Sequence, residues 1–215
     1  MNNIVVSKHP LVQQKISALR QASNTSQAFR ELSDGIGRLL MYEATLDLKL
    51  IVDNNIQVQS PISAYHPVSI ATQHALVPIL RSGLGLLNAA SDFLPHAQIH
   101  HLGLFREEST LLPVEYYNKL PQKCTVDECI VLDPMIATGG TADAAIKILK
   151  TWGVPRIKFV AICVSRQGIE RLAKEHPDVQ FFVAVIDNEL DEQGFVVPGI
   201  GDCGDRLNNT GSSKN

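Results

Sequence analysis

The sequence feature that most limits the possible folds is the stretch from Ile130 to Thr141. It begins with an apolar run that predicts a buried strand, reaches the acid Asp133, and then turns through the small residues 137–141. After this turn, apolar residues recur at helical spacing and Gly153 marks the expected helix end; the apolar positions are Ala142, Ala145, Ile146 and Leu149. The pattern predicts a strand–turn–helix unit of an α/β sheet.

The turn has the chemistry of a phosphate site. A helix that starts there presents free backbone N–H groups and the positive end of its dipole to an anion. Gly139 and Gly140 allow a close approach, and the hydroxyls of Thr138 and Thr141 can donate further hydrogen bonds. At the end of the strand, Asp133 could accept hydrogen bonds from sugar hydroxyls or help to hold Mg²⁺. The alternative is an ordinary turn with a threonine N-cap, and this stretch contains neither GxxxxGK[ST] nor GxGxxG.

A second unit of the same kind precedes the first. Residues 75–80 predict a strand that continues directly into Arg81-Ser82-Gly83, and a helix pattern follows. A guanidinium at such a tip is suited to bidentate contacts with phosphate oxygens. Local evidence supports equally a surface arginine in a salt bridge.

The third feature is the glycine-rich stretch from Gly194 to Arg206. Its glycines and proline predict a tight loop, without a regular helix, whose backbone amides are exposed at close range. Such a loop can bind a flat polar ring through its own N–H and C=O groups, although composition alone favours a structural turn.

The rest of the chain indicates one α/β domain over residues 1–215. Apolar runs at 157–164 and 179–186 predict strands buried on both faces, so we expect a doubly wound, mostly parallel sheet. A helical arm over about residues 1–50 should contain one helix from Pro10 and a longer one from near Asn24 to about Leu48. We expect this arm to pack on the flank of the sheet or to form a dimer contact.

Three further segments lie between these units. Alternating residues at 56–61 predict an exposed edge strand. Residues 98–105 predict another strand, and residues 106–113 a mobile loop that could close over the site. Tyr116 and Tyr117 follow on a return strand, where core or edge packing is favoured over stacking on a base.

Composition excludes several classes of protein. The net charge of −3 gives no sign of a nucleic-acid or membrane-surface partner, and no run of 18 apolar residues predicts a membrane span. The four cysteines form no C-x-x-C pair, which argues against a zinc or redox motif. We therefore expect a cytoplasmic protein with free thiols.

Together the three motifs resemble those of a known family. The central stretch is similar to the phosphoribosyl-diphosphate (PRPP) signature of type I phosphoribosyltransferases, in the Asp-Pro-Met-x-Ala-Thr-Gly-Gly form typical of uracil phosphoribosyltransferases. Pro-Ile-Leu-Arg-Ser-Gly resembles that family's pyrophosphate loop, with Ser82 where alanine is usual. Val-Pro-Gly-x-Gly-Asp-x-Gly-Asp-Arg resembles its uracil loop, with Cys203 where alanine is usual.

The resemblance implies the type I phosphoribosyltransferase fold with N-terminal helices and a small base-binding hood at about residues 194–206. It implies that uracil and PRPP give UMP and diphosphate, in pyrimidine salvage. The residues implied to act in catalysis are Asp133, Arg81, Arg106 and Asp202. Those implied to bind PRPP are Arg81, Arg106, Asp133, Pro134, Met135, Ile136, Ala137, Thr138, Gly139, Gly140, Thr141 and Asp202. Those implied to face uracil are Val196, Gly201, Asp202 and Cys203.

The resemblance also implies partners and a cofactor. Mg²⁺ would be carried by PRPP, with no metal ligand from the protein, and GTP is a possible allosteric activator. A homodimer or homotetramer is expected. Three other functions stay open at this point: a purine phosphoribosyltransferase, an RNA-binding regulator of pyrimidine operons on the same fold, and an inactive homologue that serves as a scaffold.

Overall fold

The apolar runs of the sequence form one central sheet. The computed structural model describes residues 3–106 and 113–210. The strands of the sheet are β1 (Ile4–Val6), β6 (His74–Leu80), β7 (Gln98–Ile99), β8 (Leu102–Arg106), β9 (Pro113–Asn118), β10 (Glu128–Leu132), β11 (Met135–Ile136), β12 (Arg156–Ser165) and β13 (Gln180–Asp187). Their order is β1-β13-β12-β10-β6-β8-β9, with β7 beside β6 and β11 beside β12. Every pair is parallel except β8 and β9.

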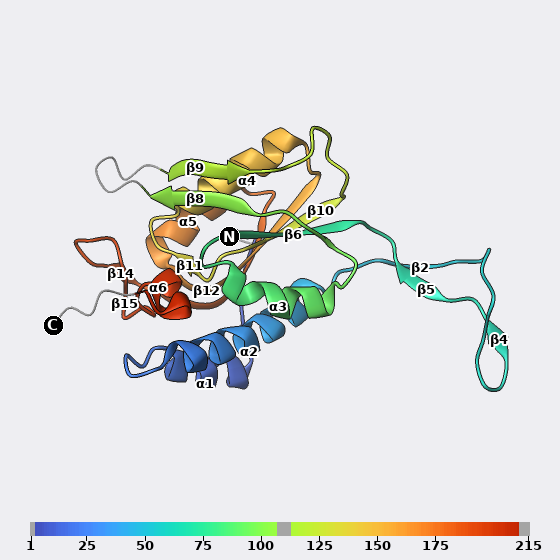
Figure 1. Ribbon diagram of the computed structural model, residues 1–215, viewed down its shortest axis with the longest axis horizontal. Helices are drawn as coiled ribbons and strands as arrows, with labels where there is room; N and C mark the ends of the chain where they lie inside the picture. The colour runs from blue at the N-terminus through green and yellow to red at the C-terminus, as the bar shows by residue number, and fades with distance from the viewer. Residues whose placement is uncertain (1–2, 107–112, 211–215) are drawn as a thin grey trace.

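Helices cover both faces of this sheet (Figure 1). They are α1 (Pro10–Leu19), α2 (Ser26–Ala44), α3 (Leu84–Phe93), α4 (Gly140–Trp152), α5 (Arg166–Glu175) and α6 (Cys203–Asn208). The sheet separates two hydrophobic cores, one that contains the apolar residues of α4 and α5 and one that contains those of α1, α2, α3 and α6. The prediction of a doubly wound, mostly parallel sheet flanked by N-terminal helices is confirmed.

The limits of α2 differ from the prediction. Its N-cap is Thr25, whose side chain accepts a hydrogen bond from the backbone N–H of Ala28 at 3.2 Å, and the helix begins at Ser26. Asn24 instead donates to the carbonyl oxygen of Ala18 at 2.8 Å and so closes the end of α1. The helix also ends at Ala44, before the predicted end at Leu48.

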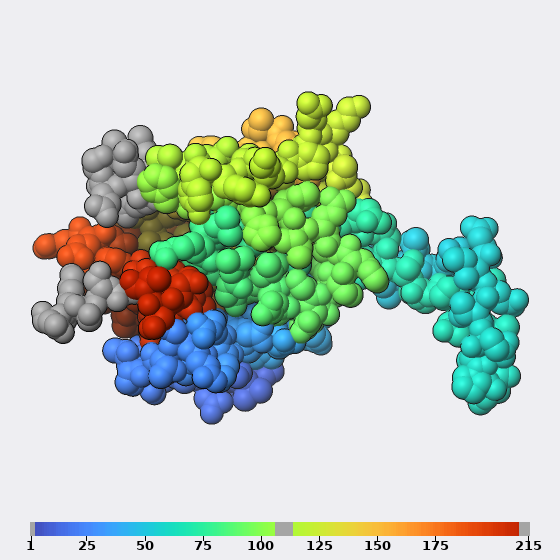
Figure 2. All heavy atoms as spheres, in the orientation of Figure 1, coloured from blue at the N-terminus to red at the C-terminus, as the bar shows by residue number. Residues whose placement is uncertain are grey.

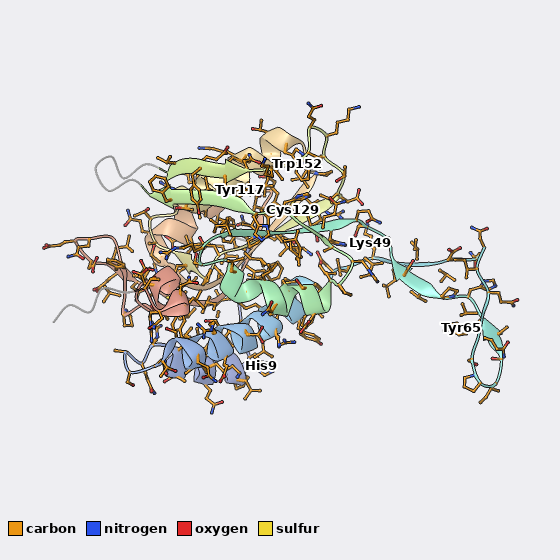
Figure 3. All side chains as sticks on the ribbon, in the orientation of Figure 1. His9, Lys49, Tyr65, Tyr117, Cys129 and Trp152 are labelled. Carbon is orange, nitrogen blue, oxygen red and sulfur yellow. The ribbon has the colours of Figure 1, made fainter. Side chains whose placement is uncertain are left out.

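The predicted edge strand over residues 56–61 is confirmed only at its centre, and it does not belong to the central sheet. Only β3 (Val58–Gln59) forms there, and it pairs with β4 (Ala64–Tyr65) away from the central sheet. Together with the pair β2 (Leu50–Val52) and β5 (Val68–Ile70), they build a protruding hairpin over residues 49–71. Figure 2 shows this hairpin extending from the body of the molecule, and Figure 3 places Tyr65 near its far end and Lys49 near its base.

The C-terminal segment differs from the predicted loop at its end. β14 (Glu189–Leu190) and β15 (Val196–Val197) form a small antiparallel pair, and the loop after them leads into α6. That helix forms because the side chain of Asp202 accepts from the backbone N–H of Asp205 at 2.9 Å, as an N-cap does.

Two further predicted segments lie between β6 and β9. The strand expected at 98–105 is divided into β7 and β8. Of the loop expected at 106–113, only the two strand ends belong to the described residues. Among the helices of the described residues, none combines the length and apolar character that crossing a bilayer requires.

Candidate active site

A cleft of about 850 Å³ lies at the carboxyl ends of β6 and β10, where open α/β sheets bind ligands. All three sequence motifs contribute to its lining. The residues are Arg81 and Ser82 from the first motif, Asp133, Met135, Ala137 and Thr141 from the second, and Gly201, Asp202, Cys203 and Gly204 from the third. Residues far apart in sequence thus form one site because parallel strands end at the same edge of the sheet.

The predicted phosphate loop leads directly into α4. Gly139 has φ = 83°, a left-handed conformation that favours glycine, and it is the N-cap of the helix. The first turn of α4 therefore presents backbone N–H groups without partners in the helix at this end of the cleft. This geometry suits a phosphate group.

The loop is supported from behind by a residue that the sequence analysis missed. Ser165, the N-cap of α5, donates its hydroxyl hydrogen to the carbonyl oxygen of Ala137 and accepts from the N–H of Gly168 at 2.9 Å. A Cβ atom at position 168 would lie 2.2 Å from that carbonyl oxygen, so the contact requires glycine. No local sequence signal links Ser165 to Ala137.

Asp133 lines the cleft together with the predicted phosphate loop (residues 137–141) and the predicted base loop (residues 194–206), and it is only 6% exposed. Its Oδ1 accepts a hydrogen bond from the Ser82 hydroxyl at 2.8 Å and one from the N–H of Met135 at 3.5 Å. Burial raises the pKa of Asp133 to about 7, against the two hydrogen bonds, which lower it. Near neutral pH this carboxyl group therefore exists in both protonation states.

The two predicted arginines are placed differently. Arg81 lines the cleft, and its guanidinium lies 3.2 Å from Asp205 and 3.3 Å from the hydroxyl of Thr210. The structure therefore combines the two alternatives, because the side chain forms a salt bridge and also faces the cleft. The backbone of Arg106 ends β8 opposite Pro113, and its side chain lies outside the described part of the chain.

Several predicted residues act through the backbone or lie behind the cleft. The carbonyl oxygen of Pro134 accepts from the N–H groups of Ile162 and Cys163 and joins the motif to β12. Ile136 and Val196 are buried in the cores. The residues from this set that do not line the cleft are Pro134, Ile136, Thr138, Gly139, Gly140 and Val196.

An ion pair that the sequence analysis missed holds the base loop. Arg20, directly after α1, forms two hydrogen bonds of 2.7 Å with Asp187 at the end of β13. Asp187 also accepts from the N–H of Gly199 at 2.9 Å, and Arg20 donates to the carbonyl oxygen of the same glycine at 2.8 Å. Burial opposes ionisation of Asp187, but the hydrogen bonds from Arg20 and Gly199 outweigh it and lower its pKa.

A second arginine joins the base loop to the N-terminal helices. Arg206 donates to the carbonyl oxygens of Leu19 at 3.1 Å, Ile200 at 2.8 Å and Gln21 at 2.5 Å. Its guanidinium also lies 4.2 Å from the ring centre of Phe29. The predicted base loop is therefore held by contacts with α1 and α2 as well as by contacts within the loop itself.

Three aromatic side chains line the cleft. Phe105 and Tyr116, on the adjacent strands β8 and β9, have ring centres 5.9 Å apart, and Phe195 lies within the base loop. Tyr116 is exposed on an edge strand, as predicted, and it also lines the cleft, where the less favoured alternative of stacking on a base would place it.

One cluster with possible metal ligands lies outside the cleft lining, at α4 and the end of α5. It contains Asp143, Glu175 and His176. Both ring nitrogens of His176 already have partners, Asp143 at 2.9 Å and Lys150 at 3.3 Å, and Lys147 pairs with Asp143 at 2.8 Å. The lysines occupy the positions that a cation needs, so the cluster joins the two helices electrostatically.

The chain is similar to known proteins over nearly its whole length. The family model described as uracil phosphoribosyltransferase matches residues 6–210. A uracil phosphoribosyltransferase of Roseiflexus sp. (strain RS-1) is 49% identical over 98% of this chain and 100% of its own length. The solved structure of the AQ2163 protein from Aquifex aeolicus has a TM-score of 0.88 at 32% identity and covers 95% of this chain and 97% of its own.

A more distant structure shares the fold alone. The adenine phosphoribosyltransferase of Trypanosoma brucei has a TM-score of 0.54 at 13% identity, and the match covers 87% of this chain and 84% of that one.

Proposed function

The chain belongs to the uracil phosphoribosyltransferase family, and we propose that its 850 Å³ cleft is the active site. The protein is a pentosyltransferase of pyrimidine salvage. In this cleft it converts uracil and PRPP into UMP and diphosphate. The observation that carries this assignment is the arrangement of the cleft. The phosphate loop at α4 and the glycine-rich base loop face the same space, which the buried carboxyl group of Asp133 also lines.

The roles follow from this arrangement. The backbone N–H groups at residues 137–141 bind the 5′-phosphate, and Asp133 accepts hydrogen bonds from the ribose hydroxyls. The backbone of the base loop, at Gly201 and Cys203, binds the polar edge of uracil. Positioning and electrostatic stabilisation account for most of the catalysis, since no side chain needs to form a covalent intermediate.

Arg81 and Arg106 stabilise the diphosphate as it leaves. Negative charge on the leaving group grows as the C1–O bond of PRPP breaks, so a cation at that point binds the transition state more tightly than the substrate. Mg²⁺ enters as part of the substrate, bound to PRPP. The described residues fit this role, because Asp133 is followed by Pro134 rather than a second acid and Asp202 already caps α6.

A base panel tests the assignment. Purified protein with Mg²⁺ and PRPP should form UMP from uracil and no product from cytosine, hypoxanthine or orotate. Product from hypoxanthine would refute our assignment of the base loop and leave the phosphate loop intact. No product from any base, with PRPP binding retained in calorimetry, would refute the enzymatic function itself.

Arg81→Ala tests the arginine. We expect kcat/KM to fall at least 10-fold, or by about 1.4 kcal/mol. Asp205→Asn is the matched control, because it removes the same 3.2 Å salt bridge but retains the guanidinium in the cleft. Equal losses of kcat/KM in the two variants would show that Arg81 acts only through its salt bridge with Asp205. That result would contradict its role in stabilising the diphosphate.

We also propose that the protein is a homodimer or homotetramer whose contacts cover the protruding hairpin. The hairpin exposes many apolar side chains; Leu50 is 66% exposed and Ile62 94%. An isolated two-stranded hairpin is only marginally stable in water, so a second copy that buries these side chains would stabilise it.

Sedimentation tests the oligomer. Leu50→Asp should shift the protein to a smaller species, whereas Gln57→Asp, which adds the same charge at an exposed polar position of the hairpin, should not. A wild-type monomer would contradict the proposal.

Two further properties are proposed from family membership. GTP is an allosteric activator, so its addition to the uracil assay should raise the initial rate, and an unchanged rate would contradict this. The protein is cytoplasmic, which its four free cysteines support.

A further inference from the structure

Two positions of the cleft differ from the usual family pattern, and both lie beside the same carboxyl group. Ser82 stands where the motif usually has alanine, and its hydroxyl donates to Oδ1 of Asp133 at 2.8 Å. Cys203, the other departure, is close enough to Asp133 for that carboxylate to raise the pKa of the thiol, in addition to the larger effect of burial. The two residues come from different motifs: Ser82 lies in the turn after β6, and Cys203 is the first residue of α6.

The hydrogen bond leaves one oxygen of Asp133 for a ligand. Oδ1 accepts from both Ser82 and the N–H of Met135. From the described residues no hydrogen bond reaches Oδ2 of this cleft-lining side chain. The Ser82 hydroxyl therefore restricts the rotation of the carboxyl group and directs its second oxygen to the substrate.

The surroundings of Asp133 make this contact important. The carboxyl group is 6% exposed, and Cys203, at 3% exposure, presents a neutral thiol to it. The groups that act on it are Ser82 from the turn after β6, the Met135 amide from β11 and Cys203 from α6. Of these, Ser82 forms the shorter hydrogen bond, so the ionised form of Asp133 depends mainly on its hydroxyl.

We propose that Ser82 is a positioning residue for phosphoribosyl transfer, which holds Asp133 with Oδ2 directed toward the ribose hydroxyls of PRPP and replaces the hydration that the Cys203 side chain excludes. The inference rests on the proposed function of the cleft and specifies how the same site binds its substrate. Ser82 acts through Asp133 and makes no contact with the reacting atoms.

The loss of this hydrogen bond has a defined consequence. Burial already raises the pKa of Asp133 to about 7, and without Ser82 the pKa should rise further. A hydrogen bond to a charged group corresponds to a shift of about 1–2 pH units. The acid limb of kcat/KM for PRPP should therefore move to higher pH by that amount, with a fall of about 10-fold near pH 7 and recovery near pH 9.

The test compares pH profiles of UMP formation. Ser82→Ala should show the shifted acid limb and a raised KM for PRPP, with the KM for uracil changed less than about 2-fold. Ser82→Thr retains the hydroxyl and should restore the wild-type profile. Ser17→Ala, on the exposed face of α1, is the matched control and should leave the profile unchanged. Thermal melting shows whether each variant is folded.

A double variant tests the role of Cys203. Ser82→Ala with Cys203→Ala restores the usual family residues at both positions and makes room for water near Asp133, so its acid limb should return toward the wild-type pH. If Ser82→Ala fails to fold, Ser82→Cys retains the size with a much weaker donor and should show the same shift.

The outcomes separate this inference from the proposed function. A wild-type protein that forms UMP, together with a Ser82→Ala profile that superimposes on it, would overturn the role of Ser82 alone. A double variant with the full shift of Ser82→Ala would overturn the compensation for Cys203. A wild-type protein that forms no UMP would refute the proposed function instead.

Discussion

Replacement of Arg20 by alanine should loosen the base loop and leave the phosphate loop in place. Arg20 forms two hydrogen bonds with Asp187 and one with the carbonyl oxygen of Gly199. In Arg20→Ala, the carboxylate of Asp187 keeps only the N–H of Gly199 and the thiol of Cys163 at 3.4 Å. Gly199 is in the loop that leads to the proposed uracil contacts, so its displacement should raise the KM for uracil.

The expected magnitude follows from the burial of the two side chains. Removing one partner of a buried ion pair costs about 3–5 kcal/mol, because the other charge is left uncompensated. The Asp187 side chain is only 7% exposed, but that of Arg20 is 23% exposed, so water can enter when the arginine is removed. We therefore expect a loss of about 2–3 kcal/mol in the free energy of unfolding at neutral pH.

The pH dependence gives a second signature. The pKa of Asp187 is lowered in the folded protein, so its pairing stabilises the fold above the unfolded pKa and this contribution is lost as pH falls through the folded value. The difference in stability between wild type and Arg20→Ala should therefore shrink at acidic pH, below about 4.

Denaturant unfolding and steady-state kinetics check this prediction at one fixed protein concentration, since the concentration affects the stability of an oligomer. The KM for uracil should rise about 10-fold, or about 1.4 kcal/mol, and the KM for PRPP much less. Arg20→Lys retains the charge without the bidentate geometry and should be intermediate. An unchanged unfolding midpoint together with an unchanged KM for uracil would refute the reasoning.

Three further predictions follow from the site. Asp133→Asn should abolish UMP formation but raise the free energy of unfolding at pH 8 by up to about 4 kcal/mol. The reason is that burial raises the pKa of Asp133 from 3.8 to about 7, so its ionised form destabilises the fold as pH rises through that window. Unfolding measured at pH 4 and at pH 8 checks this difference. Gly199→Ala should raise the KM for uracil more than about 10-fold, because its Cβ would lie 2.0 Å from the carbonyl oxygen of Val196. Gly153→Ala is the control, because Gly153 also has a positive φ but no neighbour within 4 Å. It should lower the free energy of unfolding by about 1 kcal/mol and leave the KM for uracil unchanged. A chelator should stop UMP formation, and added Mg²⁺ should restore it, with no change in the melting temperature of the protein alone, because Mg²⁺ is carried by PRPP.

Local patterns predicted the parts of the site that are continuous in sequence. The glycine after α4 predicted its end at Trp152, whereas the helix begins at Gly140, two residues earlier than the predicted end of the turn at Thr141 implied. The three motifs could be expected to meet, since parallel strands all end at one edge of the sheet. The lining of the cleft at Arg81, Asp133 and Asp202 was thus predictable from local sequence patterns.

Contacts between distant segments could not be predicted in this way. Nothing near Arg20 in the sequence indicates Asp187, and nothing near Ser165 indicates the carbonyl oxygen of Ala137. The protruding hairpin shows the same limit, because an alternating pattern describes one strand and does not identify its pairing partner. At the start of α6, the capping side chain of Asp202 outweighed the low helix propensity of Gly204.

The division of the hydrophobic core by the sheet has a consequence for how such an enzyme can change its substrate during evolution. The helix of the phosphate loop is rooted in one core, whereas Ile200, Cys203 and Leu207 belong to the other. A lineage could therefore exchange its base preference without redesigning its sugar-phosphate recognition. Arg20 binds the base loop and Arg206 binds the end of α1, so a change of base preference would have to keep the N-terminal helix and the C-terminal loop compatible with each other.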